Sequence, residues 1–191
     1  MEAYDLIVNH KKKNKTMKYR MYSMVLRQLT PMQKGIQTAH AVADYVFDLR
    51  ETDECGEWVC CDKTLIILDA GTSQDLQEAI QWLKDNNIEH RVFKEPDLYG
   101  MPTAVCFLAD ERVWDTETYP DYEHYIMDWQ KRCDEMDIVR DKDGNDTGAR
   151  YLVGHIKPGV GAWIADVFGG DVDPKPIINL REFIFSKRLS Q

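Results

Sequence analysis

The sequence predicts an α/β fold, a small three-layer sandwich in which helices cover a mixed sheet of about four strands. Four segments are predicted to be strands: residues 17–28, where apolar and polar residues first alternate, residues 90–93, and the apolar runs 64–68 and 103–108. Two stretches with helical periodicity separate the first three of these segments along the chain. The order is therefore strand, helix, strand, helix, strand, strand, and a helix between two strands places them parallel in one sheet.

The first helix has a clear start signal. In Thr30-Pro31-Met32-Gln33, a Thr precedes a Pro at the first helical position, and a Gln follows the Thr by three residues. This is the capping-box pattern, in which side chains bond the free amides of the first turn. We expect the helix to run from Pro31 to about Leu49. An apolar stripe at helical spacing is expected to face the core and comprises Ile36, His40, Ala43 and Phe47.

The next segments follow the same logic. Residues 51–62 are expected to be a polar loop, and residues 64–68 a strand buried on both faces. Asp69-Ala70-Gly71 predicts a turn, after which Thr72 or Ser73 caps a second helix. Asn86-Asn87 is expected to end this helix, because Asn tolerates the left-handed conformation.

We divide the chain into a flexible basic leader (1–16), an α/β core (17–110) and an accessory helical and loop segment (111–191) packed on that core. The segment 150–175 carries five glycines, which predicts loops and short turns. A helix is expected from Pro120 to about Met136. Its aromatic residues Tyr122, Tyr125 and Trp129, preceded by Tyr119, form a stripe typical of a helix docked on a core; the alternative is a platform for stacking bases.

Charge is unevenly spread along the chain. Residues 1–34 hold eight basic and two acidic groups, so this segment carries +6 and, with −9 for the whole chain, the remainder carries −15. A basic leading edge would attract a polyanion such as RNA. The alternative interpretation is a solvated basic tail.

The composition also argues against several classes of protein. No apolar run approaches the ~18 residues that span a membrane. The lysines near the start follow the apolar residues, the reverse of a secretory signal, so we expect a cytoplasmic protein. The five cysteines are then reduced thiols, and the spacing of Cys55, Cys60 and Cys61 does not fit a zinc site. We expect neither a metal nor a cofactor.

Two stretches carry a resemblance to a known family. The first strand and helix read Val25-Leu-Arg-Gln-Leu-Thr-Pro-Met-Gln-Lys-Gly-Ile-Gln-Thr-Ala-His-Ala, and a later stretch reads Phe93-Lys-Glu-Pro-Asp-Leu-Tyr-Gly-Met-Pro-Thr-Ala-Val. They resemble type II peptidyl-tRNA hydrolases, whose helix has the pattern Gly-Lys-x-x-Ala-Gln-x-x-His-Ala. Gln37, His40 and Ala41 fall in that register. Glu-Pro-Asp-Leu before Thr-Ala resembles bacterial and phage-encoded members. The resemblance covers about residues 20–110.

One departure bears on catalysis. Gln33 stands where the family carries its Lys, and Lys34 comes one position later, a rotation of roughly 100 degrees on a helix. Lys34 and Gln37 are nevertheless three apart and share a face. A flexible lysine at position 34 can therefore reach the same space.

The resemblance implies hydrolysis of the ester that joins a peptide to the terminal ribose of tRNA. This reaction needs an activated water, stabilisation of the oxyanion and a hold on phosphates. We expect the catalytic residues to converge at one end of the sheet, where loops that follow strands gather. The predicted catalytic residues are Lys34, Gln37, Asp97 and Thr103. The predicted substrate-binding residues are Arg27, Gln33, His40 and Glu95. The implied partner is tRNA or another phosphate-bearing ligand.

Other interpretations remain open at this point. His40 can be a hydrogen-bonded core histidine, Glu95 and Asp97 turn formers, Thr103 an ordinary strand residue, and Asp69 a turn residue. The whole protein can be a catalytically inactive binder of tRNA, a nucleotide or a host factor. It can also be a phage accessory or assembly protein. A homodimer or a protein partner would then use the aromatic C-terminal segment, in the host cytoplasm if the protein is phage-encoded.

Overall fold

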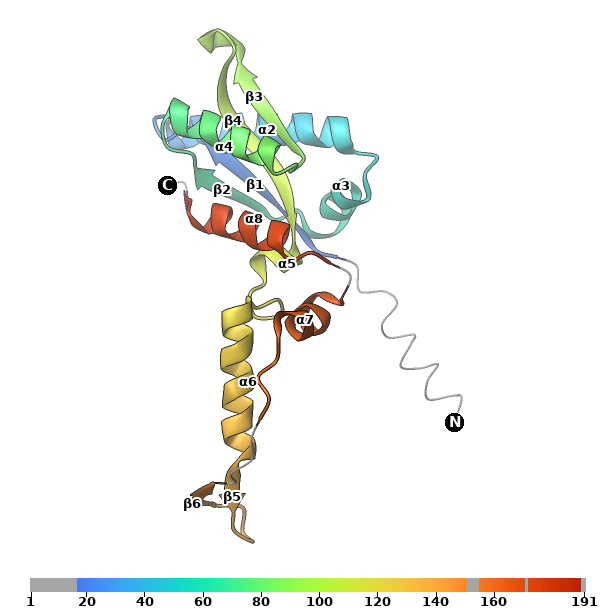
Figure 1. Ribbon diagram of the computed structural model, residues 1–191. Helices are drawn as coiled ribbons and strands as arrows, with labels where there is room; N and C mark the ends of the chain where they lie inside the picture. Colours follow the sequence, from blue (N-terminus) through green and yellow to red (C-terminus); the bar gives the residue numbers. More distant parts are fainter. Residues whose placement is uncertain (1–16, 151–154, 171, 190–191) are drawn as a thin grey trace. The chain divides into compact units, whose positions relative to one another are not determined.

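The computed structural model describes residues 17–150, 155–170 and 172–189 (Figure 1). The chain divides into two compact units, one formed by Met1–Trp114 with Phe183–Gln191 and the other by Asp115–Glu182. The predicted leader lies outside the described residues, and the predicted packing of residues 111–191 on the core stays a prediction. No helix in the described part of the chain is long and apolar enough to cross a membrane.

The first unit is built on a mixed sheet, as predicted. Four strands, β1 (Tyr19–Val25), β2 (Leu65–Asp69), β3 (His90–Glu95) and β4 (Met101–Asp110), are joined by a two-residue strand β7 (Arg188–Leu189). Their order is β3-β4-β1-β2-β7. β1 pairs parallel with β2, and β4 pairs antiparallel with both β1 and β3. Therefore β1, β2 and β3 run in one direction, and their carboxyl ends meet at one edge of the sheet.

Helix α2 (Pro31–Leu49) covers one face of this sheet, and its predicted bounds are confirmed. The Thr30 hydroxyl accepts the Gln33 amide (3.3 Å), and the Gln33 side chain accepts the Thr30 amide (3.0 Å), so the capping box forms. Cys106 of β4 donates its thiol proton to the carbonyl of Ala41 (3.0 Å). The residues that α2 buries are Lys34, Gln37, Thr38, Ala41 and Tyr45.

The predicted apolar stripe of this helix is wrong. Ile36 is 46% exposed and Phe47 72% exposed, and His40 and Ala43 are exposed as well. His40 is consequently not a core histidine. The buried face is instead partly polar, because its polar side chains find partners in the interior: the Ser23 hydroxyl, for example, donates to Thr38 (3.1 Å).

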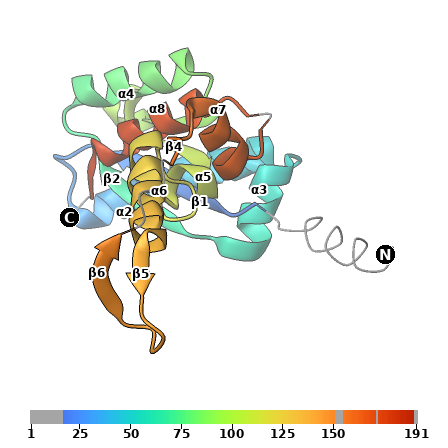
Figure 2. The ribbon, with the colours of Figure 1, turned by 60° about the horizontal axis from the view of Figure 1, so that its bottom comes forward.

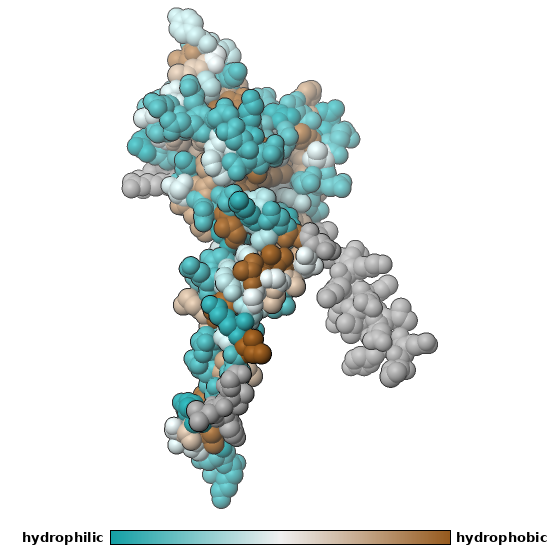
Figure 3. All heavy atoms as spheres, viewed as in Figure 1, coloured by the Kyte–Doolittle hydropathy of each residue, from teal (hydrophilic) through white to brown (hydrophobic). Residues whose placement is uncertain are grey.

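Helix α4 (Ser73–Asp85) covers the opposite face, which makes the fold a three-layer sandwich (Figure 1). Thr72 caps α4, and Asn87 takes a left-handed conformation (φ 55°) just after its end, as expected. The indole of Trp82 stacks on the ring of Phe183 (4.0 Å between centroids), and Phe107 of β4 contacts Phe183 and Tyr22. The outer face of α4 is hydrophilic (Figure 3). Phe183 belongs to the end of α8 (Lys175–Phe185).

Two local expectations about the first unit are wrong. Residues 51–62 are not a polar loop but α3 (Asp53–Glu57) followed by the π-helical turn η1 (Trp58–Asp62). Thr52 caps α3, and Cys55 and Trp58 are buried in the core beneath α2. β2 is not buried on both faces, since Leu65 is 40% exposed. The reason is its position near the edge of the sheet, since the only strand described on its outer side is the two-residue strand β7, which pairs with Leu68 and Asp69.

The second unit contains α6 (Tyr122–Met136), a hairpin of β5 (Ile138–Arg140) and β6 (Asp146–Arg150), α7 (Val160–Trp163) and the π-helical turn η3 (Ile164–Phe168) (Figure 2). The expectation of loops therefore fails over residues 160–168. The stripe beginning at Tyr119 contacts these helices: Tyr119 packs on Phe168, and Tyr122 on Trp163. Tyr125 is buried. Most side chains of the aromatic stripe therefore pack against other residues of this unit.

Candidate functional site

The candidate site lies at the edge where the three parallel strands end. Arg27 follows β1, Asp69 ends β2 and Glu95 ends β3. The first turn of α2 begins at the same edge, because α2 follows directly on β1. In open α/β sheets, ligands bind outside the carboxyl ends of the strands, where successive loops gather. The topology alone therefore brings several polar side chains to one place.

Gln37 joins three elements of the fold at this edge. The hydroxyl of Thr103, on β4, donates to the amide oxygen of Gln37 (2.6 Å). The amide nitrogen of Gln37 donates to the carboxylate of Glu95, at the end of β3 (2.6 Å). Thr103 is fully buried, Gln37 almost so, and Glu95 half-buried. The bond to Glu95 fixes the Gln37 amide in one orientation, since a flip would turn the amide oxygen toward the carboxylate, acceptor against acceptor, and lose that bond.

Glu95 is also fixed from the other side. Its second carboxylate oxygen accepts the backbone amide of Asp97 (3.4 Å), which lies in the short 3₁₀ turn η2 (Pro96–Leu98). The carboxylate is therefore held between the Gln37 side chain and the start of this turn. A carboxylate held in this way can orient a water molecule or accept its proton.

A second polar group lies at the ends of β1 and β2. Arg27 donates its Nε proton to one carboxylate oxygen of Asp69 (2.8 Å), and the Gly71 amide donates to the other (2.7 Å). The Arg27 amide in turn donates to the Gly71 carbonyl (2.9 Å). Gly71 has φ 80°, and a Cβ at this position would collide with the side chain of Asp75. The turn therefore needs glycine.

The environment lowers the pKa of Asp69. Burial acts to raise this pKa, but the hydrogen bonds from Gly71 and Arg27 and the positive charges of Arg27 and Lys34 together outweigh it. Lys34 lies in the first turn of α2, is only 9% exposed and takes part in the interactions of this region. The edge of the sheet thus carries an ionised carboxylate with two cations near it.

We predict that the Asp69 carboxylate stabilises the fold fully above about pH 4 and progressively less below it. Because its folded pKa lies below the unfolded value of about 3.9, its contribution is complete above that value and is lost as pH falls through the folded pKa. Asp69→Asn should lower the free energy of unfolding by roughly 1 kcal/mol at pH 6, since Arg27 is largely exposed and its charge is screened. Urea unfolding should show this difference shrink as pH falls below about 4. A stability difference that does not depend on pH would contradict this assignment. In an Arg27→Gln background, the effect of Asp69→Asn should be smaller, because the charge that pairs with the carboxylate is gone.

The structure connects only some of the residues predicted from the sequence. Gln37, Thr103 and Glu95 are in direct hydrogen-bond contact. Lys34 lies on the sheet-facing side of α2, as Gln37 does. Asp97 is exposed on η2 and reaches Glu95 through its backbone amide.

The remaining predicted binding residues have other contacts. Gln33 is exposed, and its side-chain oxygen bonds Thr30 in the helix cap. His40 is exposed and stacks on Phe93 (4.5 Å between centroids). Arg27 pairs with Asp69. Of these residues, only Arg27 lies in the second polar group of the edge.

Sequence reasoning underrated Asp69. The signal was present, because an Asp at the end of a strand in an α/β fold is well placed for chemistry, but Asp-Ala-Gly is also an ordinary turn. The buried pair of Ser23 and Thr38 was not foreseen. Within the described residues, no group of three or more His, Cys, Asp or Glu side chains could hold a metal ion.

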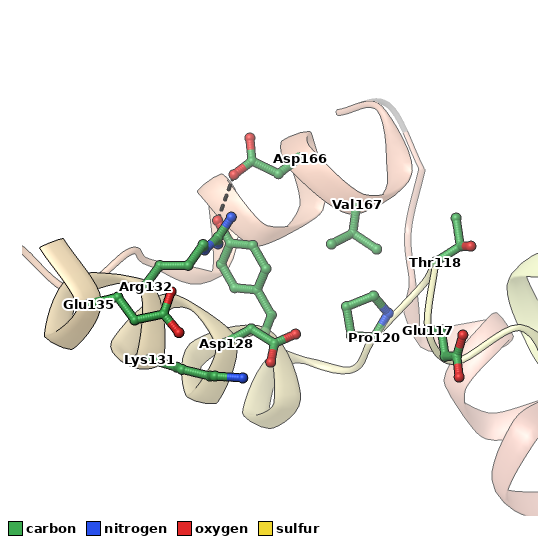
Figure 4. Close-up of a pocket in the computed structure, with 10 residues that line it drawn as sticks. Glu117, Thr118, Pro120, Asp128, Lys131, Arg132, Glu135, Asp166 and Val167 are labelled. Carbon is green, nitrogen blue, oxygen red and sulfur yellow. Dashed lines mark hydrogen bonds between the residues drawn. The ribbon is translucent and has the colours of Figure 1, made fainter. Parts of the chain in front are cut away.

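The second unit has an open pocket of its own, of about 670 Å³, between α6 and η3 (Figure 4). The hydroxyl of Tyr125 donates to Asp166 (2.6 Å) at this pocket, and this bond to a carboxylate, with burial, raises the pKa of Tyr125. Arg132 and Lys131 line it together with Asp128 and Glu135. Charges of both signs are thus mixed along its wall, which favours no single class of ligand.

Comparison with known proteins adds no relative. No protein-family model matches the chain, and no curated protein matches it either. The function must therefore be argued from the residues and geometry of the site.

Proposed function

We propose that the chain is a hydrolase of the ester bond between a peptide and tRNA, with its active site at the carboxyl edge of the sheet. The observation that carries the proposal is the pair of 2.6 Å hydrogen bonds by which Gln37 joins Thr103 and Glu95. Gln37 is 58 and 66 residues from Glu95 and Thr103 in sequence, and the three residues fall in the two stretches that resemble type II peptidyl-tRNA hydrolases. A buried polar network that ends in a partly exposed carboxylate at the end of a strand is also well placed for hydrolysis.

The proposed reaction is attack of water on the ester carbonyl. A new bond forms between the water oxygen and the carbonyl carbon, and the bond from that carbon to the ribose oxygen breaks. The products are a peptide carboxylate and a tRNA with a free terminal hydroxyl. Glu95 orients the water, takes one of its protons and passes that proton to the departing ribose oxygen, while Gln37 and Thr103 fix the direction of that carboxylate.

The cationic groups at this edge of the sheet are suited to binding a negatively charged group of the substrate. Lys34 is in the first turn of α2, where the free amides and the helix dipole also favour an anion. In the proposed mechanism it stabilises the oxyanion or a neighbouring phosphate. Its position three residues before Gln37 supports this role in spite of the one-residue departure from the family pattern.

A catalytically inactive binder of tRNA is the second possibility, and one observation favours it. Gln33, which stands where the family has Lys, has its side-chain oxygen engaged in the helix cap with Thr30. A protein that kept the fold and lost the catalytic lysine would still present Lys34 and Arg27 to a phosphate.

Release of an N-acetylated amino acid from N-acetyl-aminoacyl-tRNA by the purified protein tests the proposal. We expect multiple turnovers without added metal or cofactor, and the same rate in the presence of a chelator. The control is Gln77→Leu, because Gln77 is an exposed glutamine on α4, whereas Gln37→Leu should remove most of the activity. Binding of tRNA without turnover would support the inactive binder. Neither binding nor turnover would reject both.

A further inference from the structure

Strand β3 (His90–Glu95) lies at one edge of the sheet, with β4 as its neighbour. Among the described residues, no strand pairs with its other side. The backbone N–H and C=O groups of a strand point alternately to its two sides, so every second residue of β3 turns these groups away from β4. Such an edge can add an extended peptide as a further strand.

The pairing of β3 with β4 contains one irregularity, and it lies in β4. Phe93 is opposite Ala104 and Lys94 is opposite Pro102, so Thr103 is the extra residue. β3 itself therefore keeps the regular alternation of a strand, and it contains no proline that would remove a donor. Its outer side has the geometry that pairing with a further strand requires.

Contacts with α2 hold β3 in place along its length. Alternate side chains make them: Arg91 donates to Asp48 (2.6 Å), Phe93 stacks on His40 (4.5 Å between centroids), and Glu95 accepts from Gln37 (2.6 Å). The edge is thereby fixed before a ligand arrives, which lowers the entropy that binding costs. Its last residue is Glu95, the proposed base, so this edge leads directly to the proposed reaction centre.

The cationic groups of the site lie to the other side of Glu95. Arg27 follows β1, and Lys34 lies in the first turn of α2 and acts on the charge of Asp69, at the end of β2. β4 separates β1 from β3, so the end of β1 is about 10 Å, two strand spacings, from the end of β3. The second edge of the sheet, at residues 65–67 of β2, lies beyond these cations.

Peptidyl-tRNA has two chemically different arms, which meet at the ester bond. The RNA arm is anionic, whereas the backbone of the peptide arm is uncharged and carries a donor and an acceptor on most residues. When the ester carbonyl lies at Glu95, the cations Arg27 and Lys34 attract the RNA arm toward β1 and β2. The peptide arm then leaves on the side of β3, where the unpaired backbone edge begins.

We propose that the peptide arm binds as an additional strand, parallel to β3, with its C-terminal carbonyl carbon at Glu95. The inference rests on the proposed hydrolase and adds which part of the peptide the protein recognises. The direction is parallel because the peptide ends where β3 ends. Main-chain hydrogen bonds supply the affinity in such pairings, so peptides of different sequence should bind alike.

Methylation of single amide nitrogens in the peptide tests the proposal. The substrates are acetyl-pentapeptidyl-tRNAs in which one N-methyl group is moved along the peptide, residue by residue. We expect kcat/KM to fall roughly 2–10-fold, the worth of one backbone hydrogen bond, at every second position. The positions between are the matched controls and should show little change, since their N–H groups face away from β3. Losses without this alternation, or no loss at any position, would overturn the proposal.

Hydrogen exchange tests the contact without turnover. The Glu95→Gln variant of the full chain is saturated either with acetyl-pentapeptidyl-tRNA or with uncharged tRNA. We expect alternate amides of β3 to exchange more slowly with the peptidyl form alone, because only that form supplies the additional strand. Residues 65–67 of β2, which β7 does not pair, are the control edge and should not respond to the peptide. Peptide-dependent protection of both edges, or of neither, would contradict the pairing with β3.

The two measurements separate this inference from the proposed function. Hydrolysis of N-acetyl-aminoacyl-tRNA, combined with no alternation along longer peptides, would leave the hydrolase standing and remove the pairing with β3. Peptide-dependent protection of β3 without any hydrolysis by the unaltered chain would support the pairing in an inactive binder and reject the hydrolase. The absence of both effects would reject the two together.

Discussion

Phe107→Ala should lower the free energy of unfolding of the first unit by about 3–5 kcal/mol, the usual cost of deleting a fully buried phenylalanine side chain. Phe107 is completely buried in β4, an interior strand of the sheet. Its ring stacks on Tyr22 of β1 and contacts Phe183, which stacks on Trp82 of α4. The cavity would therefore open where the sheet, α4 and the returning end of the chain meet. Hydrogen exchange of the β1 and β4 amides measures this effect in the first unit alone.

The matched control is Phe185→Ala, the same chemical change two residues after Phe183. Phe185 is 60% exposed, so this change should alter the free energy of unfolding by no more than about 0.5 kcal/mol. Equal protection in the two variants would mean that the interior of the sheet is not packed around Phe107. A selective loss in Phe107→Ala would establish the face that α4 covers as a major source of stability.

Local signals predicted the elements that local chemistry decides. The capping box at Thr30 and Gln33 depends on atoms within four residues of each other, and so does the cap at Thr72. The left-handed Asn87 is likewise a property of a single residue. Such signals located α2 and α4, and the alternation of helices and strands then implied the parallel pairing of β1 and β2.

The errors concern burial, which distant residues decide. An apolar stripe on α2 was expected to face the core, but the residues that face it include Gln37 and Thr38, whose polar groups find partners on β1, β3 and β4. Those partners lie up to 66 residues away in sequence, so no local pattern reveals them. Thr52, which caps α3, was the one local signal overlooked in residues 51–62.

The candidate site was foreseen in part. Gln37 and Thr103 entered through the family resemblance, and neither composition nor periodicity would have selected them. The direct contact between Glu95 and Gln37 depends on where β3 ends relative to α2, which only the fold determines. For the same reason the pairing of Arg27 with Asp69, 42 residues later, could not be read from either residue alone.

Glu95→Gln should reduce the turnover of peptidyl-tRNA by about 10²–10⁴-fold, the usual contribution of general acid–base catalysis. The change removes the negative charge of the carboxylate that Gln37 holds, while it keeps the size of the side chain. Asp97→Asn should reduce turnover by less than about tenfold, because the Asp97 carboxylate is exposed on η2 and this residue reaches Glu95 through its backbone amide. Single-turnover rates on N-acetyl-aminoacyl-tRNA measure both effects.

The pair of variants separates two assignments of the catalytic base. The sequence favoured Asp97, and the hydrogen bond to Gln37 favours Glu95. Each substitution removes one negative charge from the same turn, so a general electrostatic effect on tRNA binding should be similar in both and should appear in KM. A selective loss of kcat in Glu95→Gln would assign the base to Glu95. The opposite order would return that role to Asp97 and leave Glu95 as the residue that positions η2, whereas equal losses confined to KM would leave neither carboxylate as the base.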